Sequence, residues 1–226
     1  MTAAVEDDFH CMTVTLHHDG ATIARVEGVM ERWPWTTCPG AQQVLRVSFE
    51  GVALAAAAAR GHKQANCTHL YDLAVLAAAH AGDAEPVRYD IAVSDPVEGA
   101  VTADVRCDGS LVHRLALRGD VVESPAAVAG VSLFKLRGWI ESLSGREQEA
   151  ARLLQWGALL AHGRTIPLAE QSDATRLPPN CFTFQPENKL RATRFGRIID
   201  FSGAGPPPLD HFDGAHFTPR EDRAAG

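Results

Sequence analysis

The sequence predicts an α+β fold in which two antiparallel hairpin regions form a curved sheet packed against several helices. Apolar and polar residues alternate on both sides of two Asp-Gly turns, at residues 19–20 and 108–109, which is typical of β-hairpins. Apolar residues take helical spacing in residues 66–80 and 144–162. No strand–helix–strand rhythm joins these segments, so an α+β class is favoured over a parallel α/β class.

Length, charge and composition limit the domain organisation and the partners. The chain has 226 residues, and we expect one α+β domain over residues 1–202, followed by a Pro/Gly-rich tail at 203–226. The net charge of −7 argues against a nucleic-acid partner and against docking on anionic lipid. Residues 1–8 lack the basic and apolar regions of a signal peptide, and no apolar run is long enough to span a bilayer. We therefore expect a cytoplasmic protein with no membrane partner, and a homodimer is compatible with the sequence.

The first hairpin, residues 11–30, has an apolar face and a polar face. His17, Arg25 and Glu27 lie on the polar face together with threonines. In antiparallel sheets such a face is commonly turned to solvent. The functional alternative is that helices curl over this face, so that the three side chains act as a general acid/base and anion-binding set. The sequence leaves both interpretations open.

The stretch with the most side chains able to act in catalysis or binding is residues 66–72, Asn-Cys-Thr-His-Leu-Tyr-Asp. Asn66 is a good N-cap, which would place Cys67 and His69 at the first and third positions of an alanine-rich helix that ends near His80. A thiol, an imidazole, a phenol and a carboxylate are thus gathered at one helix start.

Three active interpretations of this stretch compete with a purely structural role. Cys67 could be a nucleophile activated by the helix N-terminus, but His69 projects roughly 200° away from it. Cys38, Cys67 and His69 could bind a metal ion. The favoured interpretation makes His69 a general acid/base, with Asp72 at i+3 fixing the imidazole tautomer. The sequence contains no CxxC pair, so a zinc ribbon is not expected.

The second half of the chain continues the α+β pattern. Residues 87–117 alternate as a second antiparallel region around the turn at 108–109. Helices are predicted from residue 132 to 143 and from a Ser-Gly-Arg-Glu capping box at 144–147 onward. The last 60 or so residues are loop-rich, with a short strand expected at 180–184.

Two features outside the central stretch add candidate ligand-binding side chains. Trp33 and Trp35 flank a proline after the first hairpin, and they either pack in the core, which is commoner, or form an aromatic wall for a substrate. Arg191 and Arg194 have the i,i+3 spacing of one helix face. They either pair with surface carboxylates or grip a substrate carboxylate or phenolate.

Two motifs carry a resemblance to a known family. The Cys-Pro-Gly-Ala stretch at 38–41 and the Cys-Thr-His-Leu stretch at 67–70, after an N-terminal Asp-Gly hairpin, resemble a bacterial family known mainly as a domain of unknown function (DUF2889). The resemblance covers roughly the first 80 residues, and 180–187 and 194–202 look similar as well. It implies a link to catabolism of lignin-derived aromatic dimers, including cofactor-independent lyases that release formaldehyde.

The expected function is therefore a cofactor-independent lyase that cleaves a C–C bond of a small aromatic molecule and releases a small carbonyl. Signatures of nucleotide-dependent and serine-hydrolase chemistry are absent from the sequence. The alternative is a non-catalytic small-molecule-binding or sensor domain. In the lyase scheme a base, His69 or Glu27, removes a hydroxyl proton, and Arg25 or Arg194 stabilises the developing phenolate or enolate. Asp72 orients His69. The side chains expected to hold the substrate are Tyr71, Trp33, Trp35, His17 and Arg194.

Overall fold

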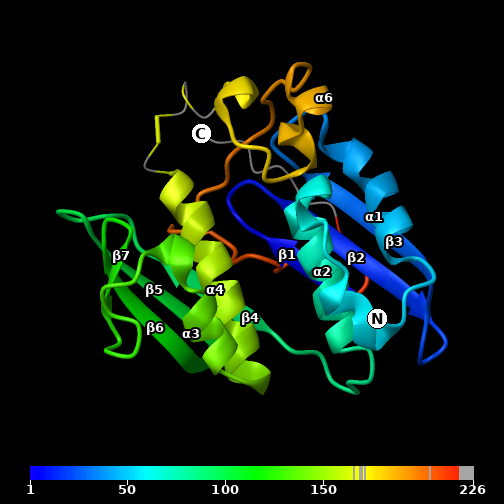
Figure 1. Cartoon of the computed structure of the whole chain (residues 1–226), viewed down its shortest axis with the longest axis horizontal. Helices are drawn as coiled ribbons and strands as arrows, with labels where there is room; N and C mark the ends of the chain where they lie inside the picture. The colour runs from blue at the N-terminus through cyan, green and yellow to red at the C-terminus, as the bar shows by residue number, and fades with distance from the viewer. Residues whose placement is uncertain (165, 168–169, 171, 204, 219–226) are drawn as a thin grey trace. The chain divides into compact units, whose positions relative to one another are not determined.

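The structure is a computed structural model that describes residues 1–164, 166–167, 170, 172–203 and 205–218. The chain forms two compact units: Met1–Asp83 with Ser172–Gly226, and Ala84–Gln171 (Figure 1). The α+β class is confirmed, and the two antiparallel regions form separate sheets of three and four strands. The division into two units is finer than the single domain expected over residues 1–202. The described part of the expected tail, as far as residue 218, belongs to the first unit.

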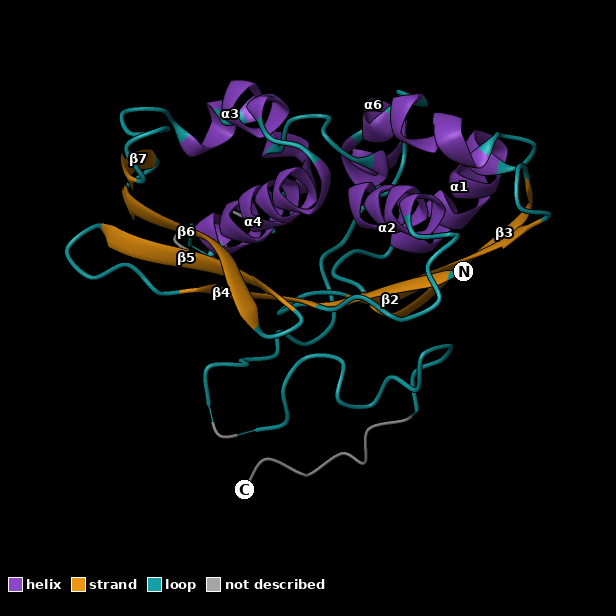
Figure 2. Ribbon diagram, turned by 90° about the horizontal axis from the view of Figure 1, so that it is seen from below, coloured by secondary structure: helices purple, strands orange, loops and turns teal. Residues whose placement is uncertain are grey.

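The first unit is built on a three-stranded antiparallel sheet in the order β1-β2-β3. Its strands are β1 (Thr2–Glu6), β2 (Cys11–His18) and β3 (Ile23–Arg32). The helices α1 (Ala41–Phe49) and α2 (Thr68–Ala79) pack on one face of this sheet (Figure 2). The β2–β3 hairpin matches the expected one, whereas β1 falls in the acidic N-terminus for which no strand was expected.

Strand alternation creates the core of the first unit. Met12, Val14 and Leu16 are fully buried against the helices, because side chains two apart in a strand share a face. Leu45 from α1 and Leu70 from α2 approach β3 at Gly28, where an added Cβ would lie 3.2 Å from the Leu45 Cδ2 atom. A glycine at this position therefore lets the start of α2 sit close to the sheet.

Short elements complete the first unit. Its 3₁₀ turns and last helix are η1 (Cys38–Gly40), η2 (Leu54–Ala59), η3 (Lys63–Ala65), η5 (Ala174–Arg176), η6 (Phe182–Phe184) and α6 (Pro186–Lys189). A 3₁₀ turn thus replaces the strand expected at 180–184. Since α6 ends at Lys189, Arg191 and Arg194 do not share a helix face as the sequence suggested.

The second unit repeats the helix-on-sheet arrangement. Its elements are β4 (Tyr89–Val93), β5 (Ala100–Cys107), β6 (Ser110–Arg118), β7 (Val121–Ser124), η4 (Leu133–Lys135), α3 (Arg137–Ser142) and α4 (Gly145–Gly163). The helices α3 and α4 cover one face of the sheet β4-β5-β6-β7 (Figure 2). Among the helices of the described residues, none combines the length and apolarity needed to cross a bilayer.

Candidate functional site

The turn between β1 and β2 is shaped by the Asp7 carboxylate. The Asp7 Oδ1 atom accepts hydrogen bonds from the backbone N–H groups of Phe9 (2.7 Å) and His10 (2.8 Å). The Asp7 N–H also donates to the His10 carbonyl at 2.9 Å. Aspartate commonly stabilises turns by bonding its own following backbone. The local sequence Asp-Asp-Phe-His therefore fixes this turn and the positions of its side chains.

At the β1–β2 turn, the alternation of side chains along the strands separates two groups of polar side chains, one on each face of the sheet. His10 is two residues before Met12, so both side chains point to the same face of the sheet, which α2 covers. Glu6 and Cys11 are cross-strand partners and lie on the opposite face. The hairpin end thus carries one polar cluster on each face of the sheet.

The first group, which we call the helix-face cluster, consists of Asp7, His10 and His69. The His10 Nδ1 atom lies 3.0 Å from the Asp7 Oδ1 atom, and the His69 Nε2 atom lies 3.5 Å from the Asp7 Oδ2 atom. The two imidazoles stack, with ring centroids 3.7 Å apart and planes 28° from parallel. His10 and His69 are only 8% and 6% exposed. One carboxylate therefore holds two buried imidazoles in contact.

Burial sets the protonation of the helix-face cluster. Burial, with smaller contributions from the charges of His10 and Lys63, lowers the pKa of His69 to about 4, although Asp7 opposes this shift. Burial alone would raise the pKa of Asp7, but the charge of His10 and hydrogen bonds from both imidazoles outweigh it. The pKa of Asp7 is consequently held well below its ordinary value. At neutral pH the cluster contains an ionised Asp7 and a neutral His69, which is able to accept a proton.

Arg32 stabilises the β1–β2 turn, which carries Asp7 and His10 of the helix-face cluster. Its Nη1 atom donates to the backbone carbonyls of Asp7 (2.8 Å) and Asp8 (2.7 Å), and its Nη2 atom donates to the Glu6 carboxylate at 3.0 Å. Arg32 pairs with Cys11 because a bulge shifts the β2–β3 register between Cys11 and Met12. Bulges commonly redirect a side chain in this way. Arg32 is thus a positioning residue for the turn.

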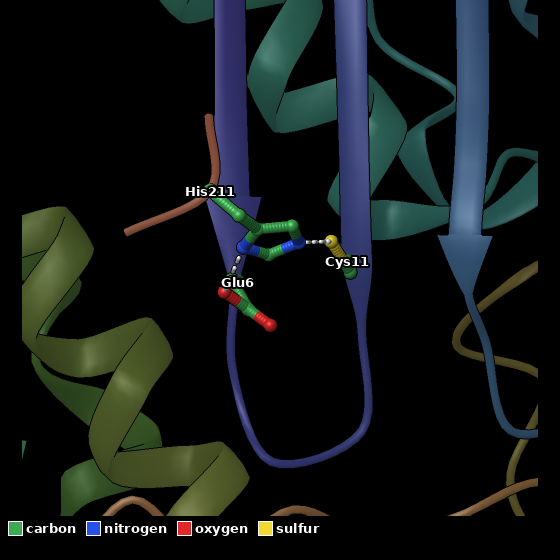
Figure 3. Close-up of side chains that lie close together, drawn as sticks. All are labelled: Glu6, Cys11 and His211. Carbon is green, nitrogen blue, oxygen red and sulfur yellow. Dashed lines mark hydrogen bonds and ion pairs between the residues drawn. The ribbon is translucent and has the colours of Figure 1, made fainter. Parts of the chain in front are cut away.

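The second group, the outer-face cluster, consists of Glu6, Cys11 and His211. Figure 3 shows the His211 ring between the other two side chains. Its Nδ1 atom lies 3.7 Å from the Glu6 carboxylate and its Nε2 atom lies 4.0 Å from the Cys11 sulfur. The Leu209 N–H also donates to Glu6 at 2.8 Å. These contacts join the C-terminal segment to the hairpin, opposite the helices.

Both clusters contain residue types that bind metals, and in each the ligand-type atoms lie within 4.8 Å of one another. In the outer-face cluster, opposite edges of the His211 ring face Glu6 and Cys11, so one ion could not take all three without a rotation of the ring. In the helix-face cluster, one nitrogen of each stacked ring faces the Asp7 carboxylate directly. The present geometry of both clusters fits direct hydrogen bonds and ion pairs better than a shared ion.

His69 lies in a cluster, but its partner differs from the expected one. Asp72 instead pairs with the Lys63 ammonium at 2.5 Å, and Asp7 supplies the carboxylate beside His69. The helix starts one residue later than expected, with Cys67 as N-cap. Burial raises the pKa of the Cys67 thiol to about 12, so it is protonated at neutral pH and poorly suited as a nucleophile.

The group formed by His17, Arg25 and Glu27 does assemble, but it does so far from His69. Arg25 forms an ion pair with Glu27, and His17 lies 3.3 Å from the Arg25 guanidinium and 3.5 Å from Glu27. All three side chains are more than two-fifths exposed. His17 is seven residues from His10 along one strand, a separation of about 23 Å. The solvated alternative therefore describes this group, and Glu27 and Arg25 are not partners of His69.

The expected aromatic residues have different locations. Tyr71 is 5% exposed and its ring packs against Phe49 with centroids 5.0 Å apart, so it is a core residue. Trp33 contacts Phe195 edge-to-face at 5.7 Å. Trp35 is 4% exposed, and the Arg194 Cζ atom lies 5.8 Å from its ring centroid. Of these residues, Trp35 and Arg194 lie near the helix-face cluster.

The connection between Trp35 and the cluster runs through Phe9. The Arg194 Cζ atom lies 5.2 Å from the Phe9 ring centroid, and Phe9 directly precedes His10 in the turn. The Phe9 and His10 rings also meet edge-to-face at 6.3 Å. Arg194, Trp35 and Phe9 thus form the described surroundings of the cluster on the side of the turn.

Sequence reasoning missed most of the residues around His69. Asp7 lies in the N-terminal stretch 1–8, for which no strand or site was expected, and His10 and Arg32 were not singled out. The available signal was the turn sequence Asp-Asp-Phe-His between a short apolar stretch, Ala3 to Val5, and an alternating stretch, Met12 to Leu16. His211 had no local signal, because its partners are about 200 residues away in the chain.

Comparisons with models of known families, with curated proteins and with solved structures find no match to this chain. The resemblance to the DUF2889 family therefore stays a prediction from the two motifs. The candidate site has to be interpreted from its own geometry.

Proposed function

We propose that this protein is an enzyme that transfers a proton on a small aromatic molecule, with His69 as the base and Asp7 as the group that holds it. The observation that carries the proposal is the helix-face cluster, in which one ionised carboxylate contacts two buried, stacked imidazoles. Buried titratable groups with shifted pKa values and specific charged partners are typical of catalytic sites. The group formed by His17, Arg25 and Glu27 is solvated and lacks these properties.

The electrostatics keep His69 in the form that accepts a proton, and the lowered pKa also makes it a weaker base than a free imidazole. Because the pKa of His69 is lowered to about 4, its imidazole is neutral over the physiological range. A base must be unprotonated before it can act, and a nearby carboxylate stabilises the imidazolium that forms when it accepts a proton. Asp7 contacts both imidazoles, so His10 could share the proton after the transfer.

The reaction that we propose is a carbon–carbon lyase reaction without a cofactor. His69 takes the proton of a substrate hydroxyl group, and the electrons of that O–H bond form the carbonyl of the released compound. The electrons of the broken C–C bond stay on the remaining carbon, which then receives the proton back. Formaldehyde is released when the hydroxyl belongs to a hydroxymethyl group. The choice of this reaction follows the family resemblance, whereas the proton transfer follows the geometry of the cluster.

Access to the cluster requires a movement. His10 and His69 are nearly covered in this structure. The described segment against the turn includes Arg194, which contacts Phe9, and Ile199, whose N–H donates to the Asp8 carbonyl at 2.9 Å. We propose that substrate binding displaces the residues around Ile199 from the turn, as is common for residues that cover active sites, while the backbone bridge between Trp35 and Arg194 stays in place.

The direct test is a turnover assay on a panel of lignin-type aromatic dimers that carry a hydroxymethyl group. Formaldehyde and the mass of the remaining product are measured for the wild type, for His69→Asn and for His80→Asn. His80 is a matched control, because it is the histidine that caps the other end of α2. We expect equimolar formaldehyde and product from the wild type and from His80→Asn, and at least a 100-fold lower kcat for His69→Asn.

Two outcomes would overturn the proposal. Full turnover by a folded His69→Asn protein would remove His69 from the mechanism. Quenching of tryptophan fluorescence by the dimers without any product would favour a binding or sensor domain instead of an enzyme.

A further inference from the structure

The segment that carries Arg194 is held to the tryptophan loop by backbone pairing. The Thr36 N–H donates to the Thr193 carbonyl at 3.0 Å, and the Phe195 N–H donates to the Pro34 carbonyl at 3.0 Å. Trp35 and Arg194 are the paired residues of this short antiparallel bridge. The backbone position of Arg194 is therefore defined, and its side chain projects beside the Trp35 ring.

The Arg194 guanidinium contacts aromatic rings instead of acceptors. Its Cζ atom lies 5.2 Å from the Phe9 centroid and 5.8 Å from the Trp35 centroid. Among the residues that the structure describes, it has no carboxylate partner and no hydrogen-bond acceptor. The side chain is half-buried, and burial lowers its pKa from the ordinary value. Ring faces attract the cation but do not satisfy its five N–H donors.

A second arginine near the same turn shows what a structural role looks like. Arg32 donates to two carbonyls and one carboxylate at 2.7–3.0 Å, so its guanidinium is used by the fold. Arg194 differs because, among the described residues, its guanidinium contacts ring faces and has no acceptor. A half-desolvated cation without an acceptor is costly unless a bound group completes it.

We propose that Arg194 binds the carboxylate of a small aromatic acid, and that this acid is the substrate class of the neighbouring helix-face cluster. The planar fork of an arginine matches a carboxylate with two parallel hydrogen bonds, which a single phenolate oxygen cannot form. The partly exposed ring of Phe9 provides apolar surface for the body of such a ligand, whereas the buried Trp35 ring supports the guanidinium from behind. Phe9 directly precedes His10, so the carboxylate anchor lies beside the proton-transfer residues.

The substrate assignment rests on the proposed function, but carboxylate binding does not. The experiment therefore measures binding of simple probes rather than turnover. Benzoate, benzamide and acetate are titrated into the full-length protein at constant ionic strength, and binding is followed by calorimetry. The wild type should bind benzoate at least tenfold more tightly than benzamide, which has the same ring without the charge, and more tightly than acetate, which has the charge without the ring.

Variants locate the site. Arg194→Met keeps an apolar stem of similar length and should weaken benzoate binding at least tenfold while leaving benzamide binding unchanged. Arg194→Lys keeps a charge without the fork, and it should also weaken benzoate binding while the far-UV circular dichroism stays native. Arg191→Met is the matched control, because Arg191 is an exposed arginine on the same segment that bonds to Asn188. It should bind benzoate like the wild type.

The possible contrary results are distinct. Equal binding of benzoate and benzamide by the wild type, or an unchanged benzoate affinity in both Arg194 variants, would overturn the carboxylate anchor. Acetate binding as tight as benzoate binding would show a general anion site and would overturn the aromatic acid assignment. Tight, Arg194-dependent benzoate binding without turnover of any aromatic acid would overturn the substrate assignment and leave the anchor in place. Loss of turnover in His69→Asn with normal benzoate binding would support both roles separately.

Discussion

A group of titratable side chains lies beside each end of strand β2, and the two groups differ in burial. At one end, the imidazoles of the helix-face cluster are 6–8% exposed, and they contact one carboxylate. At the other end, His17, Arg25 and Glu27 contact one another just as closely, but all three side chains are more than two-fifths exposed. Similar residue types at similar distances therefore acquire different chemistry because burial differs.

The comparison shows why composition alone is a poor guide to a site. In water, the charges of the exposed group are screened, and such pairs contribute little to stability. In the helix-face cluster, burial favours the neutral imidazole of His69 while the imidazoles stabilise the ionised Asp7. A neutral base and a negative charge can coexist there at pH 7.

The largest expected difference is in turnover. Asp7→Asn removes the charge that holds both imidazoles but keeps an amide oxygen for the turn, and we expect kcat to fall by roughly 10²- to 10⁴-fold. Glu27→Gln makes the same chemical change at the exposed end and should leave kcat within about twofold. Steady-state assays on the best substrate of the panel measure both. An equal fall in kcat for Asp7→Asn and Glu27→Gln would contradict the proposed functional difference between the buried and the exposed group.

The next difference is in stability, and it compares two arginines. Arg32→Met breaks the buried ion pair with Glu6 and removes the donor of two carbonyls of the turn, so we expect a loss of roughly 3–5 kcal/mol in the free energy of unfolding. Arg25→Met removes an exposed pair and should cost less than about 1 kcal/mol. Urea denaturation of both variants checks this. A small loss for Arg32→Met would mean that the turn is held by other contacts.

Acid should weaken the fold through His69. Its pKa is about 4 in the folded protein against 6.5 ordinarily, so the unfolded chain binds more protons between these values. The free energy of unfolding should consequently fall as the pH is lowered from about 6.5 to about 4, by roughly 3 kcal/mol from this residue. Asp7, whose pKa is also lowered, adds a further loss at still lower pH.

A variant separates this contribution from general acid denaturation. His69→Asn should show a smaller loss of stability between pH 6.5 and 4 than the wild type does, as measured by urea denaturation at several pH values. His17→Asn, at the exposed end of the strand, should keep the wild-type slope. Parallel pH profiles for the wild type and His69→Asn would contradict the assigned burial of the imidazole.

The smallest expected effect concerns the exposed group itself. His17→Ala removes a side chain that is 46% exposed and touches only other exposed charges. We expect the free energy of unfolding at pH 7 to change by less than about 0.5 kcal/mol. Thermal denaturation would reveal a larger change, and such a change would show that this face is covered in the working protein.

The sequence was informative where structure is local. The Asp-Gly turn and the alternation around it predicted the β2–β3 hairpin, and helical spacing predicted α2 and α4. His69 was singled out because it lies at the start of a helix. Its true neighbours come from a turn about 60 residues earlier, and alternation alone could not show which face of the hairpin α2 would cover.

The mistaken partner of His69 has a simple physical reason. Asp72 has the correct i+3 spacing, but Lys63, just before the helix, offers it a full positive charge at 2.5 Å. The sequence favoured a solvent-facing polar side for the first hairpin and left the covered alternative open. The described structure leaves its far end exposed and covers only the end near Cys11 with the C-terminal segment.

The central claim is that His69 is a buried, neutral imidazole held by Asp7 and ready to accept a proton. Nuclear magnetic resonance of ring-labelled histidine tests it without any substrate, with the His69 signals assigned by their loss in His69→Asn. We predict that His69 remains neutral at pH 7 and titrates near pH 4, and that Asp7→Asn changes this titration. A His69 ring that titrates near 6.5 and does not respond to Asp7→Asn would contradict the account.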